Sequence, residues 1–204
     1  ADVNGDYINI NGEKSNAVSK SYYSTFSLWD TYRAAHPLYT LLQEKRSAEF
    51  INSMLEQYRE HGYLPIWALW GKETYCMIGN HAIPVIVDAY FKKLPNVDWK
   101  MAYEAIKNSS VTSHQNSAFY LLDKFGYFPE NIESQSVSIG LEIAYNDWCV
   151  AQMAKSLGHV EDYDYFTKRS SYYKNYFDSN IGFFRAKDDK GNWIEPFSPL
   201  KYGG

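Results

Sequence analysis

The 204-residue chain lacks several features that define whole classes of protein. It has two cysteines, Cys76 and Cys149, too few for a disulfide framework, and because both stand among apolar neighbours we expect two buried free thiols. No apolar run approaches the roughly 20 residues of a membrane span. The N-terminal segment 1–12 lacks the charged and apolar regions of a signal peptide. The net charge is −4 and basic residues never occur in runs longer than two, which argues against a nucleic-acid partner.

Several catalytic motifs are also missing. The sequence contains no HExxH, no GxSxG, no glycine-rich phosphate loop and no cluster of Cys and His. What it has in abundance is aromatic residues, with 19 Tyr, 11 Phe and 6 Trp. Tyr and Trp are amphipathic, so such a chain can fill its core and still line a wet cleft.

Apolar residues at helical spacing run through most of the sequence. The pattern predicts helices over residues 29–42, 47–61, 81–93, 98–108, 113 or 115 to 126, 135–158 and 161–177. We expect Ser47 and Asp98 to cap the helices that they begin, and Gly62 to end one. Pro37 should kink the first helix or restart it.

Short hairpins are expected at both ends of the chain. Residues 7–10 form a strand that turns at Asn11-Gly12, and residues 183–197 form a hairpin that turns at 188–191. The sequence therefore predicts an all-α fold of antiparallel helical hairpins, divided into 1–25, a helical part 26–178, and a C-terminal hairpin 179–204. The ordered but irregular stretch 63–79 is long enough to suggest function.

One alternative for the N-terminal segment is a calcium loop. Asp2, Asn4, Asp6 and Glu13 fall at positions one, three, five and twelve of an EF-hand. Tyr7 occupies the place of the required glycine, and no helices flank the loop. We therefore favour the hairpin.

Four long strings carry a resemblance to a known family. They are FSLWDTYR (26–33), YLPIWALWGKETYCMIGNHAIPVIVDAY (63–90), SVSIGLEIAYNDWCVAQMAKSLG (136–158) and GFFRAKDDKGNWIEPFSP (182–199). Together they resemble glycoside hydrolase family 92, the calcium-dependent exo-acting α-mannosidases, over nearly the whole chain.

The resemblance implies a fold and an activity. The fold would be the first half of an (α/α)₆ toroid, and the parent enzyme would remove terminal α-linked mannose from glycans with inversion, using calcium to bind and distort the sugar. The family's catalytic acid and base lie in segments expected beyond Gly204, so we expect no catalytic residue and no metal ligand in this chain, and no activity from it alone. The resemblance also implies a secreted or periplasmic parent. A half ring exposes apolar helix faces, which offers a route to self-association.

Six residues are predicted to bind substrate. The resemblance places Trp29 and Asp30 in the mannose subsite, although Asp30 is also a natural helix N-cap. Glu73 lies in Gly71–Thr74, where Lys72 replaces the family's Asn. Asn80 and His81 precede a helix, and Asn80 could simply cap it. The predicted set is Trp29, Asp30, Glu73, Asn80, His81 and Asp147.

Two other functions stay open at this point. One is a non-catalytic helical module that binds carbohydrate or a protein partner. The other is a toroidal enzyme whose acid and base both lie within the chain, since inverting hydrolysis needs two carboxyl groups about 6.5–9.5 Å apart. The candidate carboxyl groups for that version are those of Asp30, Glu73, Glu133, Glu142 and Asp147. By default Glu142 is a solvated or salt-bridged helix residue.

Overall fold

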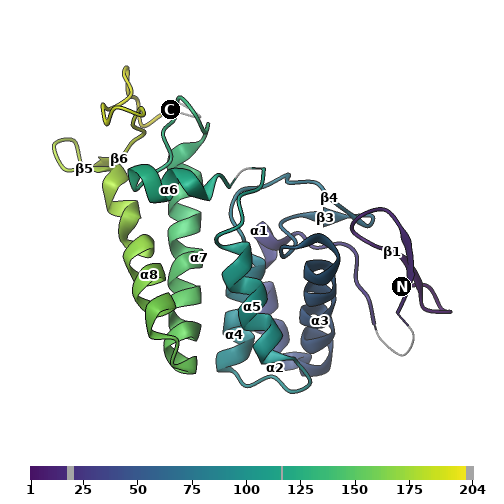
Figure 1. The fold of residues 1–204 in the computed structure, drawn as a ribbon. Coiled ribbons are helices and arrows are strands. Elements are labelled where there is room, and N and C mark those ends of the chain that lie inside the picture. Colours follow the sequence, from purple (N-terminus) through teal and green to yellow (C-terminus); the bar gives the residue numbers. More distant parts are fainter. Residues whose placement is uncertain (18–20, 116, 201–204) are drawn as a thin grey trace.

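The computed structural model describes residues 1–17, 21–115 and 117–200, and helices dominate them (Figure 1). The helices are α1 (Leu28–Thr31), α2 (Ala35–Leu42), α3 (Glu44–His61), α4 (Ala82–Phe91), α5 (Trp99–Ser109), α6 (Phe119–Phe125), α7 (Ser136–Leu157) and α8 (Val160–Ser170), followed by the 3₁₀-helix η1 (Ser171–Tyr176). The predicted all-α class is confirmed.

Three short antiparallel strand pairs accompany the helices. They are β1 (Asp6–Ile8) with β2 (Lys14–Asn16), β3 (Ala68–Leu69) with β4 (Lys72–Glu73), and β5 (Phe177–Asp178) with β6 (Phe183–Phe184). The hairpin expected at the N-terminal end is present. At the C-terminal end the strand pair β5–β6 turns at 179–182, and the hairpin expected over 183–197 is reduced to one bridge, between Lys187 and Trp193. The N-terminal hairpin turns over five residues instead of two, because the Asn9 side-chain oxygen accepts the backbone N–H groups of Asn11 and Glu13 and so closes a wider loop.

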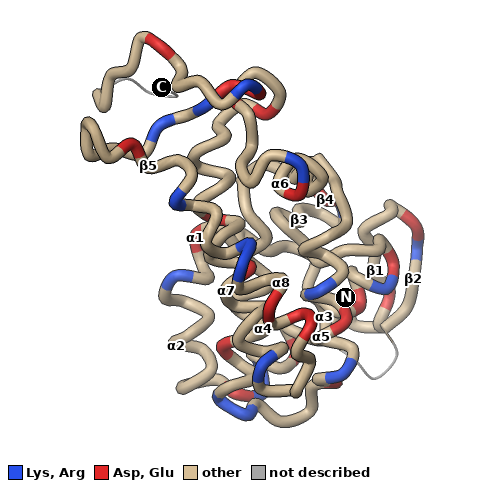
Figure 2. Tube along the Cα trace, turned by 60° about the vertical axis from the view of Figure 1, so that its left-hand side comes forward, with Lys and Arg blue, Asp and Glu red and all other residues tan. Residues whose placement is uncertain are grey.

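The helices pack in successive pairs. Contacts join α2 to α3, α4 to α5, and α7 to α8, while α4 also packs against α2 and α7. Figure 1 shows these helices side by side, with α6 and the β3–β4 and β5–β6 hairpins gathered at one end. Lys and Arg are interspersed with Asp and Glu along the chain (Figure 2). Among the described helices, none is both long and apolar enough to cross a membrane.

Local signals account for several helix ends. The Asp98 carboxylate accepts the Met101 N–H at 3.0 Å, which confirms the predicted cap of α5. Gly62, Gly126 and Gly158 follow α3, α6 and α7 with φ of +90°, +74° and +79°, the left-handed conformation that glycine adopts without cost.

Other predicted boundaries were wrong. Helix α3 begins at Glu44, so Ser47 lies buried inside it and does not cap it. By contrast, the helix expected over 29–42 does restart, as one alternative for Pro37 predicted: Pro37 sits in the first turn of α2, where its missing N–H breaks no helical hydrogen bond. The helix predicted from Ser113 or Gln115 begins only at Phe119.

The two cysteines differ in their surroundings. Cys149 is buried on α7, and burial raises the pKa of its thiol to about 12. Cys76 is exposed, so the expectation of a second buried thiol was wrong. Apolar sequence neighbours did not bury Cys76, because the segment between β4 and α4 runs over the surface.

Two clusters of buried side chains form the core. The larger one joins α3, α4, α5, α7 and α8, and the smaller one joins α6 to the first half of α7. Helix α7 therefore contributes to both, with Ile139 and Ile143 in the smaller cluster and Val150 and Met153 in the larger. The position of α7 fixes how the two core clusters are placed relative to each other.

The surroundings of Gly140 on α7 show how closely the side chains of this core are packed. A Cβ atom there would lie 2.3 Å from the hydroxyl of Tyr176, whose ring is fully buried and whose oxygen accepts the Phe128 N–H at 2.7 Å. Helix propensity alone predicts that Gly140→Ala stabilises the protein by about 1 kcal/mol. We expect the opposite, a loss of about 1–3 kcal/mol from overpacking, measured as a lower urea midpoint. A midpoint at or above that of the wild type would contradict this packing.

Candidate functional site

Helix α1 carries Trp29 and Asp30 as consecutive residues. Leu28, fully buried, anchors this short helix in the core, while Trp29 is half-buried and Asp30 is exposed. Asp30 does not occupy the N-cap position, which belongs to Ser27. Its carboxylate instead accepts a hydrogen bond from the Ser27 hydroxyl at 2.5 Å. The capping role weighed for Asp30 is therefore wrong, and its side chain is exposed.

A second pair of side chains meets this helix from α4 and α7. His81, at the start of α4, stacks on the Tyr32 ring with 4.1 Å between centroids and 4° between planes. Its Nε2 lies 3.2 Å from Oε2 of Glu142. The same carboxylate oxygen accepts the Tyr32 hydroxyl at 3.4 Å, and Oε1 lies 3.4 Å from the Arg33 guanidinium. Glu142 is thus where three elements converge.

A buried amide network assigns the tautomer of His81. Asn146 Oδ1 accepts the backbone N–H of Asn80 at 2.8 Å, so the amide nitrogen of Asn146 faces His81 Nδ1 at 3.3 Å. That nitrogen can only donate, and Nδ1 therefore accepts. In neutral His81 the proton is on Nε2, which faces Glu142. The Asn80 side chain donates to the Ser109 carbonyl at 2.9 Å and does not cap α4.

The electrostatics of this group favour an ionised carboxylate. Burial raises the pKa of Glu142, but the hydrogen bond and charge of His81 and the charge of Arg33 outweigh it, and the net pKa is lowered. Arg33 also lies over the rings of Trp29 and Tyr32, 4.8 Å from each centroid. The indole N–H of Trp29 is buried and makes no full hydrogen bond to a described residue, although it is near enough to help lower that pKa.

Glu73 organises the loop before α4. Its carboxylate accepts four backbone N–H groups at 2.7–2.9 Å, those of Ile66, Trp67, Thr74 and Tyr75. Three of these bonds end on one oxygen. The contacts support a structural role for Glu73, and its contact with substrate stays a prediction.

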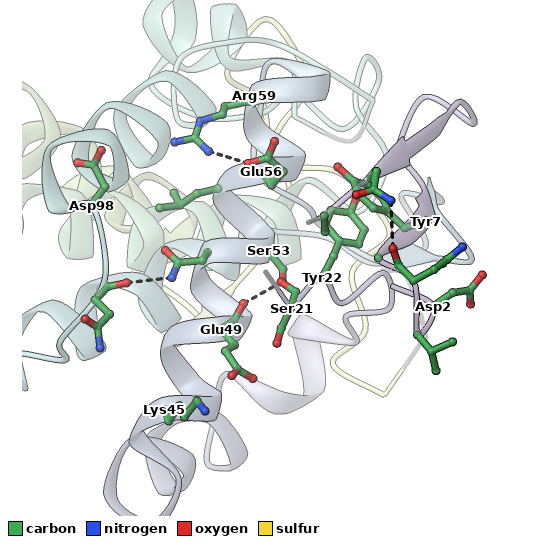
Figure 3. Close-up of a pocket in the computed structure, with 18 residues that line it drawn as sticks. Asp2, Tyr7, Ser21, Tyr22, Lys45, Glu49, Ser53, Glu56, Arg59 and Asp98 are labelled. Carbon is green, nitrogen blue, oxygen red and sulfur yellow. Dashed lines mark hydrogen bonds and ion pairs between the residues drawn. The ribbon is translucent and has the colours of Figure 1, made fainter. Parts of the chain in front are cut away.

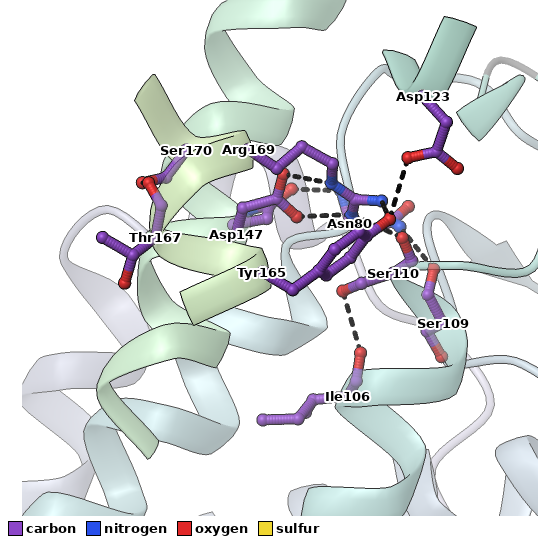
Figure 4. A network of polar contacts seen from close by, with 11 residues as sticks. Asn80, Ile106, Ser109, Ser110, Asp123, Asp147, Tyr165, Thr167, Arg169 and Ser170 are labelled. Atoms are coloured by element: carbon purple, nitrogen blue, oxygen red, sulfur yellow. Dashed lines mark hydrogen bonds and ion pairs between the residues drawn. The ribbon is translucent and has the colours of Figure 1, made fainter. Parts of the chain in front are cut away.

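Asp147 belongs to a different network (Figure 4). Both of its oxygens pair with Arg169 of α8, at 2.7 and 2.6 Å, and the two side chains are 1% and 2% exposed. Arg169 also donates to the Ser110 carbonyl at the end of α5 and to the Tyr165 hydroxyl. These contacts support a structural role for Asp147, and its contact with substrate stays a prediction.

A wide groove lies elsewhere on the described surface. This groove of about 1000 Å³ separates the N-terminal hairpin from α3, with Tyr7 and Tyr22 on one side and Glu49 and Glu56 on the other (Figure 3). None of the six predicted substrate-binding residues lines it.

The EF-hand alternative finds no support in the side-chain contacts. Asp6 pairs with Lys14 at 3.0 Å, and Glu13 accepts from Asn9 at 3.3 Å, so both carboxylates are used within the hairpin. Across the described ranges, no three side chains of His, Cys, Asp or Glu gather closely enough to hold a metal ion.

The structure thus brings together part of the predicted set. Trp29 and Asp30 lie on α1, and the buried His81 packs on Tyr32, directly after that helix, with Asn80 buried next to it. Glu73 and Asp147 stand in separate networks. The prediction omitted the connecting residues, Tyr32, Arg33, Glu142 and Asn146. One signal was available: Glu142 and Asn146 are four residues apart in a helical pattern and so share a face.

Comparisons with known proteins give one family. The family model described as the glycosyl hydrolase family 92 catalytic domain matches residues 1–204. A solved family GH92 α-mannosidase from Bacteroides thetaiotaomicron is 40% identical, with a TM-score of 0.93 over 99% of this chain and 27% of its own. The same enzyme has been solved with mannoimidazole, giving a TM-score of 0.94, again at 40% identity, over 100% of this chain and 27% of its own.

Two further relatives agree. A family GH92 inverting mannosidase from B. thetaiotaomicron VPI-5482 is 34% identical, with a TM-score of 0.89 over 98% of this chain and 27% of its own. An uncharacterized secreted glycosidase from Arthroderma benhamiae is 28% identical over 74% of this chain and 21% of its own length. The chain thus spans about a quarter of the length of the relatives that it matches.

The Asp147–Arg169 pair generates a stability prediction. Asp147→Asn leaves the Arg169 charge buried without its counter-ion, and we expect the free energy of unfolding to fall by about 3–5 kcal/mol. Urea denaturation measures this. The double variant Asp147→Leu with Arg169→Met removes both charges, and its free energy of unfolding should fall less than that of the single variant. A single variant with the wild-type midpoint would refute the structural role.

The lowered pKa of Glu142 generates a pH prediction. Its folded-state pKa lies below the ordinary value of 4.5, so the ionised carboxylate stabilises the fold above that pH. The contribution is lost as the pH falls through the folded-state pKa. Between pH 7 and pH 3.5, the free energy of unfolding of Glu142→Gln should therefore fall less than that of the wild type. The exposed Glu44→Gln is the control, and parallel pH profiles for wild type and Glu142→Gln would contradict the prediction.

Proposed function

Because the chain belongs to glycosyl hydrolase family 92, we propose that it is one part of an inverting α-mannosidase that removes terminal α-linked mannose from glycans. In this proposal the chain supplies one wall of the mannose subsite and another part of the protein supplies the acid and the base. The remaining helices of an (α/α)₆ toroid would complete the ring. The secreted relative supports a secreted or periplasmic location.

One observation carries the proposal. The exposed Asp30 directly follows the half-buried Trp29 on a helix whose following residues, Tyr32 and Arg33, contact Glu142 and His81. A pyranose ring places its axial C–H bonds on an aromatic face and its hydroxyls on charged acceptors. Trp29 would be the face and Asp30 the acceptor.

Glu142 and His81 would act as positioning residues. The Glu142 carboxylate holds the Tyr32 hydroxyl and Arg33, and His81 stacks beneath Tyr32. Together they fix the end of α1 against α4 and α7. That arrangement keeps Trp29 and Asp30 in place before a sugar arrives, which lowers the ordering cost of binding.

The carboxyl groups of the chain are poorly suited to the acid role. A general acid at neutral pH needs a raised pKa, whereas the pKa of Glu142 is lowered. Asp147 is sealed against Arg169, and Glu73 is bonded to four backbone groups. Glu133, which is half-buried, is the exception, since burial and then the charge of Glu130 raise its pKa. It is the first residue to test if the chain proves active alone.

Calcium would be bound by the parent enzyme outside this chain. The described carboxylates do not converge on a cation site, and each carboxylate near the wall except that of Asp30 is already paired. No step of the mechanism on this chain therefore runs through the ion.

Exposed apolar side chains support self-association of the isolated chain. Leu41 and Leu42 on α2 are 70% and 66% exposed, and Trp148 on α7 is 52% exposed. Such surface is normally covered by a partner or by more of the same chain.

Mannose release from α-1,2-mannobiose, with and without calcium, tests the proposal. The 204-residue chain should release none, while the longest natural protein that contains it should be active. In that protein, Asp30→Asn should lower kcat/KM by about 10–100-fold, the loss of a charged hydrogen bond of about 1.5–3 kcal/mol. Glu44→Gln is the matched control.

Two outcomes would overturn parts of the proposal. Calcium-dependent release by the 204-residue chain would place a complete acid–base pair within it. An inactive longer protein that still binds mannose would indicate a non-catalytic carbohydrate-binding module.

A further inference from the structure

Asn146 is a buried amide on α7 that the proposed function does not use. It is 1% exposed and lies one helical turn after Glu142, so both side chains extend from the same face of α7. The imidazole of His81 lies between them. Its Nδ1 is 3.3 Å from the amide nitrogen of Asn146, and its Nε2 is 3.2 Å from Oε2 of Glu142. One helix therefore contacts both nitrogens of a single imidazole ring.

The amide of Asn146 has one favourable orientation. Its Oδ1 accepts the backbone N–H of Asn80 at 2.8 Å, and a backbone N–H can only donate. In the reversed orientation two donors would face each other inside the core, and a buried donor without a partner is costly. The amide nitrogen is therefore held toward Nδ1 of His81. A proton on Nδ1 would meet this second donor, so the neutral ring carries its proton on Nε2.

Asn80 is anchored in turn. Its side chain donates to the Ser109 carbonyl at 2.9 Å (Figure 4). The Ser109 hydroxyl oxygen accepts the Leu64 N–H at 2.8 Å. These buried contacts join the start of α4 to the end of α5 and to the loop after α3. The orientation of the Asn146 amide is thus fixed by segments that lie outside α7.

The contact with Glu142 does not select the tautomer. Nε2 and Oε2 are close, but the N–H is not directed at the oxygen well enough for a full hydrogen bond. Gly79 closes this side of the ring, because a Cβ there would lie 2.5 Å from Nε2. The Tyr32 ring stacks on the imidazole, and the Tyr145 ring lies 5.9 Å from that of Tyr32. Selection of the tautomer therefore falls to Asn146.

The charge of His81 decides how the Glu142 carboxylate is shared. A carboxylate this close would favour an imidazolium, which would compete with Arg33 for the same oxygens. A neutral ring leaves the negative charge to Arg33, whose guanidinium lies 3.4 Å from Oε1 and 4.8 Å from the centre of the Trp29 ring. In acid, where Glu142 itself titrates, the ring takes up a second proton and adds its charge to that of Arg33.

We propose that Asn146 is a positioning residue, which holds His81 neutral at pH 7 with its proton on Nε2 and thereby keeps Arg33 on Glu142 beside Trp29. The effect on the sugar rests on the proposed function, because it needs Trp29 in the mannose subsite. The protonation state of His81 does not depend on the sugar and is measured separately.

Two-bond ¹H–¹⁵N spectra of the ¹⁵N-labelled chain report the tautomer and charge of each histidine ring. Single His→Gln variants assign the five histidines, so the His81 signals also follow by elimination. For the wild type at pH 7 we expect the neutral Nε2–H form. Asn146→Asp still accepts the Asn80 N–H but offers Nδ1 an acceptor, so His81 should gain a second proton. Asn52→Asp makes the same charge change on the exposed side of α3 and is the matched control.

Activity tests the consequence for the site. In the longest natural protein that contains this chain, Asn146→Asp should lower kcat/KM for mannose release about tenfold, the size of one coupled contact within a polar network. Asn52→Asp should stay at the wild-type value.

The spectra and the activity separate Asn146 from the proposed function. A wild-type His81 that carries its proton on Nδ1, or that is an imidazolium at pH 7, overturns the role of Asn146 even if Asn146→Asp does not fold. A ring that stays neutral in Asn146→Asp overturns it too, because another residue would then set its charge. An imidazolium with unchanged kcat/KM refutes the positioning role. If the longer protein releases no mannose, the proposed function fails, and the spectra still decide the role of Asn146.

Discussion

The buried ion pair between Asp147 and Arg169 is the interaction on which the rest of the domain depends. It joins α7 to α8, and through the Ser110 carbonyl it also holds the end of α5. A buried pair adds little net stability, but it tolerates few other arrangements of the helices around it. Because Glu142 lies on the same helix, an α7 fixed by Arg169 also presents Glu142 to His81 and to the end of α1.

The acidic residues of the chain divide by what their carboxylates contact. Glu73 is bonded to backbone, Asp147 is sealed against a guanidinium, and Glu142 is ionised within a ring of donors. Asp30 accepts a bond from Ser27 and is otherwise exposed. This division supports the proposal that the chain binds a sugar while another part of the protein supplies the acid and the base.

Local patterns predicted the helices well, because their causes are local. Apolar spacing, the Asp98 cap and the glycines after α3, α6 and α7 act within a few residues of the chain. The site was harder to predict. The role of Glu142 depends on His81, 61 residues earlier, and that of Asp147 on Arg169 of the next helix, and no local pattern names those partners. The prediction for Cys76 failed for the same reason, because the path of the loop decides whether this side chain is exposed.

The most direct test of the account is a crystal structure, bound to mannoimidazole, of the longest natural protein that contains this chain. We expect the sugar ring of the inhibitor to lie on Trp29 with a hydroxyl in hydrogen-bond range of Asp30, and His81 and Glu142 to keep their contact. An inhibitor bound with Trp29 and Asp30 untouched would contradict the assignment of this wall to the mannose subsite.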